Sequence, residues 1–591
     1  MRSPLFVFAL NFLLLASFAA QARGTIDDVV IMGLDRSQDA EIIENIEVSL
    51  SLYSSLGKRQ GESRLEYLLL QAERETRRAL EPFGFYSPTI TVDAPRQEGE
   101  EHFTVTIHVE KGEPVRVRNA QIVMNGPARY DRYLTQDLEE FRPNPGEVFD
   151  HSVYEDSKNR ITQRLGERGY FDADFSVRQV LITRADYAAD IDLGWDSGAR
   201  YNMGPTAFQQ DYFRPSLLNQ LVYWKEGDYF HQGRLDRLRE SLIKLDYFSV
   251  IDIQPRPEQA TEDYRVPIDV NLTLARRSIY SAGLSYGSES GIGVRLGLER
   301  RYVNSRGHKL NSEIDYAQNR KQLFSQYRVP AFRWVDGWYG FALSAYDEQT
   351  DYIDMRNFRL TASRSGELNQ RWTAIASINA LRERWSYDIN NSGYNRYEYA
   401  TLIYPEISVD YVNVDDRMFP HRGISANAFV RGGTTSDSAF IQGWARMRWF
   451  QGLGSNSRMI LRGEGGTTWT NELVGMPPSV RFFAGGDQSI RGYAWREVGP
   501  RTPPPDKFAL GAKYLVTASA EFEHYFKGGP WGGAIFVDGG DAFDTTPNFR
   551  YGVGIGLRWR TLVGPVRIDI AHGLNNPDSQ FQLYLNIGAN L

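Results

Sequence analysis

The C-terminal half of the chain consists of short segments in which apolar and polar residues alternate. The pattern begins near Ser278 and continues to Leu591, the last residue. In residues 581–591 one set is Phe, Leu, Leu, Ile, Ala and Leu, and the set between them is Gln, Tyr, Asn, Gly and Asn. Residues 292–298 and 551–559 repeat the pattern, with glycine and arginine in the second set. A period of two predicts β-strands, and these two faces are typical of strands between lipid and a polar lumen.

The number of strands, together with the requirement that backbone amides in hydrocarbon be hydrogen-bonded, predicts a closed barrel. There are about 16 segments, at about 20 residues for each strand and its connection, which suits tilted membrane strands of about 9–11 residues. No run of about 20 apolar residues follows Arg23, which argues against helical membrane spans. In hydrocarbon every backbone amide must be paired, so the sheet must close. We predict a 16-stranded antiparallel transmembrane β-barrel over residues 277–591.

Closure fixes where the seam of this barrel should lie. The last strand must meet the first, so we predict a seam between residues 280–286 and residues 581–591. The residues that mark it are Tyr280, Leu284, Tyr286, Phe581, Leu585 and Gly588. A soluble β-sandwich also alternates, but its apolar face is usually more varied and it seldom ends at the last residue of a chain.

Residues 1–22 have the composition of a signal peptide. Arg2 gives a short positive region, an apolar run follows from Leu5 to Ala19, and Ala20-Gln21-Ala22 is an A-x-A cleavage site. We predict export, with a mature chain that starts at Arg23. An N-terminal membrane anchor is the alternative, although the run is short for a membrane span.

The region from Arg23 to the barrel contains one order of elements three times. Strand, helix, helix, strand and strand are predicted in residues 23–112, 113–198 and 199–276. Each second helix ends in a turn with two aromatic residues, which are Phe85-Tyr86, Tyr170-Phe171 and Tyr247-Phe248. We expect these pairs to cap the core of each module, with contact to a partner as the alternative.

These modules resemble POTRA domains, the periplasmic β-α-α-β-β units of outer-membrane assembly proteins. The resemblance rests on the element order and the recurring turn, over about 250 residues. A three-stranded sheet leaves an unpaired edge, to which an extended client segment can add a strand through main-chain hydrogen bonds. Main-chain pairing depends little on sequence, which suits a protein that accepts many clients.

The composition and short motifs give no sign of an enzyme, a cofactor or a metal site. The chain has no cysteine, so disulfides and thiolate metal sites are excluded. Its net charge of -7 does not indicate a nucleic-acid partner. Gly283-Leu284-Ser285-Tyr286-Gly287 matches G-x-S-x-G, but it lies in an alternating strand and lacks the helix that follows a nucleophile elbow.

A long irregular segment, residues 470–508, interrupts the late strands and contains Ile490-Arg491-Gly492-Tyr493. Irregular loops of this length are usually functional. The alternation of the two strands that follow places Glu521 and Asp538 on the lumen face. We predict that the loop folds into the lumen, where the Arg491 fork binds these acids and Gly492 permits close approach. A solvated Arg491 in a simple turn is the alternative.

Three segments resemble the superfamily of BamA, TamA and the two-partner-secretion transporters. Residues 490–493 are similar to its VRGF/Y loop signature, with isoleucine in place of valine. Residues 519–522 and 536–540 are similar to its twelfth and thirteenth strands. The resemblance implies that Arg491 is the loop arginine and that its wall partners are Glu521, Asp538 and Gly540.

The number of modules favours the TamA branch of this superfamily. BamA-like members carry five POTRA modules, and two-partner-secretion transporters carry two after a plug helix. The resemblance implies an outer-membrane protein that inserts client proteins, usually autotransporters, by sideways opening of its seam. It also implies a TamB-like partner anchored in the inner membrane, and contact with outer-membrane lipid. A two-partner-secretion-type transporter and a bridge for phospholipid transport are the alternatives.

Overall fold

The computed structural model describes residues 23–95, 101–287, 290–332, 337–349, 353–386, 397–434, 439–473, 475–502, 509–561, 564–575 and 581–587. The predicted signal peptide lies outside this range. The chain separates into two compact units. One contains the described residues up to Ala207 with 224–237 and 253–269, and the other contains 208–223, 238–252 and the residues from Val270 onward. Within the described residues, no helix combines the length and apolar character needed to cross a membrane.

The first module is a four-stranded sheet with two helices. The sheet order is β2-β1-β4-β3, and β1 runs parallel to β4. The elements are β1 Arg23–Met32, α2 Ala40–Ser49, β2 Arg59–Gly61, α3 Glu62–Leu80, β3 Thr89–Asp93 and β4 His102–Glu110. Alternate residues of β4 are buried, because the sheet packs one face against apolar residues of both helices.

The second and third modules each have a three-stranded sheet, in the orders β5-β7-β6 and β8-β10-β9. The second contains β5 Arg116–Asn125, α4 Arg132–Glu139, α5 His151–Glu167, β6 Asp174–Thr183 and β7 Ala188–Asp196. The third contains β8 Asn202–Gln209, α6 Pro215–Leu218, η5 Asn219–Leu221, α7 Gln232–Leu245, β9 Phe248–Pro255 and β10 Arg265–Leu274. The first helix of the third module was expected over residues 215–222; it changes after Leu218 from an α-helix to the 3-10 helix η5, which ends at Leu221.

The aromatic turns do more than cap their own modules. Phe85 packs against the core of the first module, whereas Tyr86 is 8% exposed within the core of the second. Likewise the ring of Phe171 lies 5.5 Å from that of Tyr201 and 4.7 Å from that of Phe230, both in the third module. The expectation of simple caps was wrong for these second rings, which join one module to the next.

The third aromatic turn contacts the barrel through the first ring of its pair, Tyr247. Tyr247 is fully buried, its hydroxyl donates to the carbonyl of Gly307, and its ring stacks on Phe213 at 4.7 Å. Gly307 lies in the turn between barrel strands β12 and β13. Ala275 N donates to the Tyr247 carbonyl at 2.8 Å. An aromatic side chain of the turn therefore links the last module to the barrel, as such side chains link the modules to one another.

We expect the junction between the first two modules to weaken in acid. The His151 ring contacts Tyr86 and Phe149, and burial lowers the pKa of His151. A separated junction therefore binds more protons than the closed one, so the junction loses stability as pH falls below about 6.5. The protection factors of the amides around residues 84–87 of the full chain, which correct for the slower intrinsic exchange in acid, should be several-fold lower at pH 5.5 than at pH 7.5. In His151→Phe, which keeps a ring without a titratable group, this pH dependence should disappear; its persistence would contradict the assignment.

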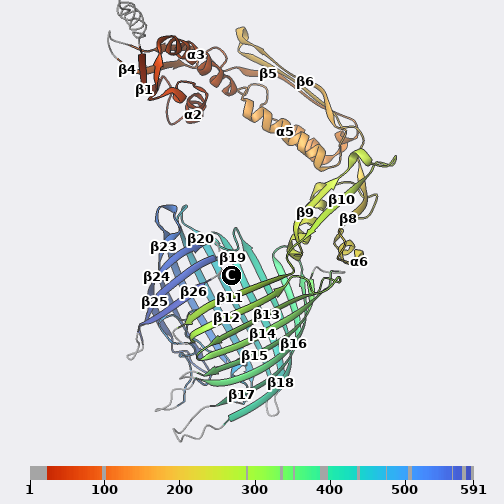
Figure 1. Ribbon diagram of the computed structural model, residues 1–591, viewed down its shortest axis with the longest axis vertical. Coiled ribbons are helices and arrows are strands. Elements are labelled where there is room, and N and C mark those ends of the chain that lie inside the picture. The colour runs from red at the N-terminus through yellow and green to blue at the C-terminus, as the bar shows by residue number, and fades with distance from the viewer. Residues whose placement is uncertain are drawn as a thin grey trace, which may run out of the picture. The chain divides into compact units, whose positions relative to one another are not determined.

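The second half of the chain is a sheet of 16 antiparallel strands in sequence order, from β11 to β26. The two end strands contact each other, so the sheet curls into a barrel (Figure 1). The strands are β11 Ser278–Gly287, β12 Gly291–Arg300, β13 Lys309–Ala317, β14 Arg320–Pro330, β15 Gly337–Gln349, β16 Asp354–Glu367, β17 Trp372–Ser386, β18 Tyr397–Val414, β19 Gly423–Thr434, β20 Ala439–Gly452, β21 Ser457–Thr470, β22 Tyr514–Tyr525, β23 Trp531–Phe543, β24 Arg550–Thr561, β25 Gly564–Gly573 and β26 Gln582–Ile587. The predicted fold class is confirmed.

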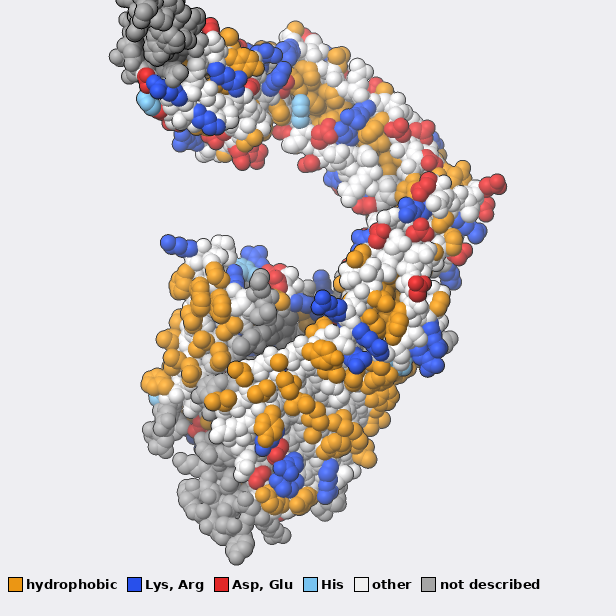
Figure 2. All heavy atoms as spheres, viewed as in Figure 1, with side chains coloured by type: hydrophobic (Ala, Val, Ile, Leu, Met, Phe, Trp, Pro, Cys, Tyr) orange, Lys and Arg blue, Asp and Glu red, His pale blue; other side chains and the backbone are white. Residues whose placement is uncertain are grey.

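The two faces of the barrel wall follow the predicted alternation. On β22, Val516 is 45% exposed and Phe522 is 38% exposed, whereas Thr517 and Glu523, which have the opposite parity, are buried. Figure 2 shows many hydrophobic side chains on the face of the outer wall that is turned to the viewer. An apolar outside and a polar inside are what a barrel in hydrocarbon requires.

Candidate functional site: an arginine clamp in the barrel lumen

The segment between β21 and β22 is an irregular loop, and its described residues, 471–473, 475–502 and 509–513, fill part of the lumen. It contains the short 3-10 helix η7 Pro478–Val480 and isolated bridges, one of which joins Phe482 to Ala512. Because β22 begins at Tyr514, the loop ends at Lys513 and not at the predicted residue 508. Its apolar side chains are buried against the inner wall in a cluster that includes Val498 and Leu515. The loop is held inside the barrel by packing as well as by polar contacts.

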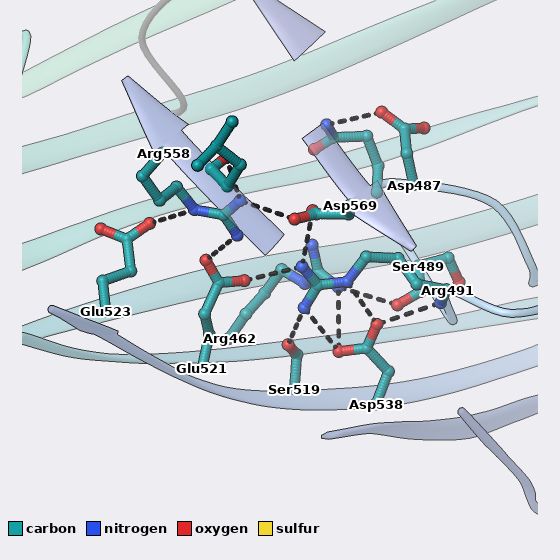
Figure 3. Close-up of polar contacts among 12 residues, drawn as sticks. Arg462, Asp487, Ser489, Arg491, Ser519, Glu521, Glu523, Asp538, Arg558 and Asp569 are labelled. Carbon is teal, nitrogen blue, oxygen red and sulfur yellow. Dashed lines mark hydrogen bonds and ion pairs between the residues drawn. The ribbon is translucent and has the colours of Figure 1, made fainter. Parts of the chain in front are cut away.

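Arg491 lies in this loop and points into a group of carboxylates on the wall (Figure 3). Its Nε and one terminal nitrogen donate to the two oxygens of Asp538 at 2.7 and 2.9 Å, so the fork binds this carboxylate twice. The other terminal nitrogen donates to Glu521 at 2.7 Å and to Asp569 at 3.1 Å. A contact of 3.4 Å to the Ser519 hydroxyl gives each of the five guanidinium N–H groups an acceptor.

Burial strengthens these contacts. Arg491 is 4% exposed and Asp538 is fully buried. The backbone N–H of Arg491 also donates to Asp538, at 3.0 Å, and the guanidinium carbon lies 3.4 Å from the centre of the Phe536 ring. Because its three acids stand on β22, β23 and β25, one loop residue is bound to three strands of the wall. We name this group, Arg491 with Glu521, Asp538 and Asp569, the clamp.

Gly492 allows the backbone to reach the wall. Its φ of +96° lies in the left-handed region, and a Cβ there would stand 2.5 Å from the carbonyl carbon of His572. The Gly492 N–H donates to the Tyr584 hydroxyl at 3.1 Å, and this hydroxyl donates to the Tyr493 carbonyl at 2.9 Å. Tyr584 lies on β26, so the loop tip is tied directly to the last strand.

The two remaining residues of the loop motif are packing residues. Ile490 is fully buried in the cluster beneath the loop, beside Phe482. Tyr493 is 2% exposed, and its hydroxyl accepts a hydrogen bond from Asn575 N at 3.2 Å. They fix the backbone on either side of Arg491 and thereby aim its side chain.

Gly540 was predicted as a wall partner, and it lies on β23 outside the described contacts of Arg491. A Cβ at this position would stand 2.4 Å from the Val516 carbonyl oxygen. The glycine therefore lets β22 and β23 approach closely, two residues beyond Asp538. Its described contacts shape the wall.

A second arginine, which no sequence motif connects to the site, belongs to the same network. Arg558 on β24 is 1% exposed. It donates to Glu521 at 2.6 Å, to Asp569 at 2.6 Å and to Glu523 at 2.7 Å. Glu521 and Asp569 thus each bridge two guanidinium groups, and Glu523 also accepts from Arg458 at 2.6 Å.

The contacts in this network indicate what the site can do. Buried carboxylates that bind guanidinium groups are structural anchors, because removal of one partner leaves an uncompensated charge. Within the described part of the chain, no group of three or more His, Cys, Asp or Glu is arranged to hold a metal ion. The arrangement can hold the loop against the wall.

The predicted seam residues lie on the two end strands, and those with described side chains are exposed. Their exposed fractions are 74% for Tyr280, 85% for Leu284, 75% for Phe581 and 40% for Leu585. The side chain of Tyr286 and all of Gly588 lie outside the described residues. Contact between β11 and β26 agrees with the order of strands that closure requires.

Comparisons with known families match both halves of the chain. The profile of the Omp85 superfamily domain matches residues 280–590. A profile described as POTRA domain TamA domain 1 matches residues 28–111. A POTRA profile described as a surface antigen variable number repeat matches residues 120–193.

Individual relatives are distant. The outer membrane protein assembly factor BamA of Nitratidesulfovibrio vulgaris is 24% identical over 367 residues, which are 58% of this chain and 44% of the relative. The chain thus matches less than half of that protein's length. The crystal structure of BamA from Haemophilus ducreyi lacking POTRA domains 1–3 has a TM-score of 0.65 at 18% identity, over 80% of this chain and 99% of that one. It shares the fold. The chain belongs to the Omp85 superfamily, as an outer-membrane β-barrel preceded by periplasmic POTRA domains.

Proposed function

We propose that this protein is a TamA-type assembly factor that inserts client proteins, such as autotransporters, into the outer membrane. A client strand pairs with the edge exposed when β11 and β26 separate, so one set of main-chain hydrogen bonds replaces another. The observation that carries the proposal is the clamp, because it anchors the lumen loop to β22, β23 and β25 and leaves the two end strands outside its ion pairs.

The order of the strands supports an opening at this point, because β11 and β26 are the two end strands of the sheet. The clamp keeps the neighbouring wall and the loop in place during that displacement, while Tyr584 couples the loop tip to the moving strand.

The partner proposal concerns the first module. The match of its sequence to the TamA domain 1 profile supports a TamB-like partner anchored in the inner membrane. β3 is an edge strand of this module, so an extended partner segment can add to it. Site-specific crosslinking from residues 89–93 should capture that partner, and equal capture from the second module would count against it.

Reconstitution separates this function from its alternatives. Vesicles that contain the protein should insert an unfolded autotransporter barrel faster than empty vesicles, with the client resistant to protease in the membrane. A secretion transporter would deliver a client to the vesicle lumen or exterior, and a lipid bridge would move labelled phospholipid without affecting insertion. Insertion no faster than in empty vesicles would overturn the proposal.

We expect Tyr584→Phe to loosen the seam. The change removes a hydroxyl that accepts from Gly492 and donates to Tyr493, and a lost pair of this kind costs about 1–3 kcal/mol. The closed seam should become about tenfold less favoured, seen as more frequent openings in single-channel recordings. Tyr551→Phe, which alters an exposed tyrosine on the outer wall, is the matched control. Identical traces for Tyr584→Phe and wild type would show that this bond does not restrain β26.

A further inference from the structure

Basic side chains stand in one row across the outer wall of the barrel. Successive residue pairs join β13 to β18 through Tyr316, Lys321, Asp347, Arg356, Arg384 and Tyr399. Directly opposed residues of neighbouring strands share a face of the sheet, so these six side chains lie on the same side of the wall. Tyr316 and Tyr399 are 61% and 57% exposed, which identifies that side as the outer one.

The next outward row is mostly apolar. It runs through Ile314, Leu323, Ala345, Phe358, Arg382 and Thr401. Ile314, Leu323 and Phe358 are 38–44% exposed, whereas Asn357 and Glu383, of the opposite parity, are buried. The two rows border a hollow of about 600 Å³. A largely apolar floor edged with cations fits an amphiphile with an anionic head group.

The basic residues are only partly neutralised. Arg356 pairs with Asp347 at 2.9 Å, and Arg384 pairs with Asp354 at 3.7 Å. Lys321 and Arg382 have no carboxylate within salt-bridge distance among the described residues. They lie against Tyr316 and Tyr399, each with its charge 5.4 Å from the ring centre. Four cations and two carboxylates leave an excess of two positive charges at the outer wall.

The register also gives the depth of this patch. Tyr316 pairs with Val294, which pairs with Leu284 in the second half of β11, away from the end at which the chain enters the barrel. The patch therefore lies toward the extracellular end of the barrel. Outward cations are costly at the centre of a membrane and cheap near the head groups. Figure 2 shows Lys and Arg side chains with a few acids among hydrophobic ones near the lower end of this wall.

We propose that this patch binds a phosphorylated glycolipid of the lipid A class in the outer leaflet. Lys321, Arg356, Arg382 and Arg384 span four strands, from β14 to β17, which is about 14 Å at the usual strand spacing. A diacyl phospholipid such as phosphatidylglycerol has a single phosphate and reaches one end of this span, whereas phosphates on separate sugars reach both. The acyl chains lie along Ile314, Leu323 and Phe358, and the guanidinium forks bind phosphate oxygens.

The test compares two variants of the full-length protein in phosphatidylcholine nanodiscs. One carries Lys321→Gln, Arg356→Gln and Arg382→Gln. The control carries Arg417→Gln, Arg422→Gln and Lys527→Gln, three exposed residues in turns at the opposite end of the barrel, and so has the same charge change. Native mass spectrometry measures the binding of lipid A, of dephosphorylated lipid A and of phosphatidylglycerol.

Wild type and the control should bind lipid A equally. The patch variant should bind lipid A about a hundredfold more weakly, because each of its three lost cations weakens binding near a membrane surface by about fivefold. Dephosphorylated lipid A should bind wild type as weakly as lipid A binds the patch variant. Equal lipid A binding by the patch variant and wild type would overturn the proposal, as would equal loss in the control. Phosphatidylglycerol that binds the patch as tightly as lipid A would also overturn the choice of glycolipid.

Discussion

Replacement of Arg491 with alanine is expected to abolish most client insertion while the barrel still forms. The change leaves Asp538, Glu521 and Asp569 buried without the guanidinium that binds all three. The loss of one partner of a buried ion pair costs about 3–5 kcal/mol, which is enough to release the loop tip from the wall. Barrel assembly depends on the backbone ladders and the apolar outer face, so heat-modifiable migration should persist. The measurement is the rate of client insertion into vesicles.

Arg491→Lys separates charge from geometry. Lysine keeps the positive charge but lacks the planar fork, and it has three donors in place of the five that Arg491 uses. We expect an intermediate rate, closer to alanine than to wild type. Arg295→Lys is the control, because Arg295 makes ion pairs with Glu313 and Asp315 but is 56% exposed. Full activity in Arg491→Ala would show that the clamp has no role in insertion.

A covalent lock across the seam is expected to stop client insertion reversibly. The protein has no native cysteine, so pairs placed along residues 280–286 and 581–587 can form only the intended disulfide. If clients enter between β11 and β26, an oxidised pair removes the edge to which they add, and a reductant restores it. Client insertion should fall to the level of empty vesicles and then recover.

The control for this lock is a disulfide within an adjacent ladder. Leu296 and Ile314 are direct partners on β12 and β13, and both side chains point outward. Residues in register across antiparallel strands lie within the distance that a disulfide spans. Leu296→Cys with Ile314→Cys should leave insertion unchanged. Full insertion with the seam locked would rule out sideways opening.

The alternation of the strands was sufficient to predict much of the site. A period of two assigns each wall residue to the lumen or to the lipid, and this placed Glu521 and Asp538 on the lumen face together with Arg558. Parity does not say which residues meet across the lumen, because that depends on the register and curvature of all the strands between them. Asp569 and Tyr584 could not be joined to Arg491 from the sequence for this reason.

The aromatic turns show the same limit on a larger scale. The recurrence of these turns indicated repeated modules. The sequence around Tyr86 is the same, however, whether its ring packs in the core of its own module or in the core of the next module. Which core the ring enters depends on how consecutive modules pack together, and the sequence pattern of a single module does not show this. A helix was expected over residues 215–222, but the sequence pattern did not show that its second half is the 3-10 helix η5, because buried leucines occur in both halves.

Hydrogen exchange at the loop tip tests the clamp most directly. Residues 485–498 should be strongly protected in the wild-type protein in nanodiscs, because Arg491 and its acids hold the tip against β22, β23 and β25. In Arg491→Ala this protection should fall by about a hundredfold or more while the strand amides remain protected. Exchange in the wild-type tip as fast as in an exposed loop, or unchanged protection in Arg491→Ala, would contradict the account.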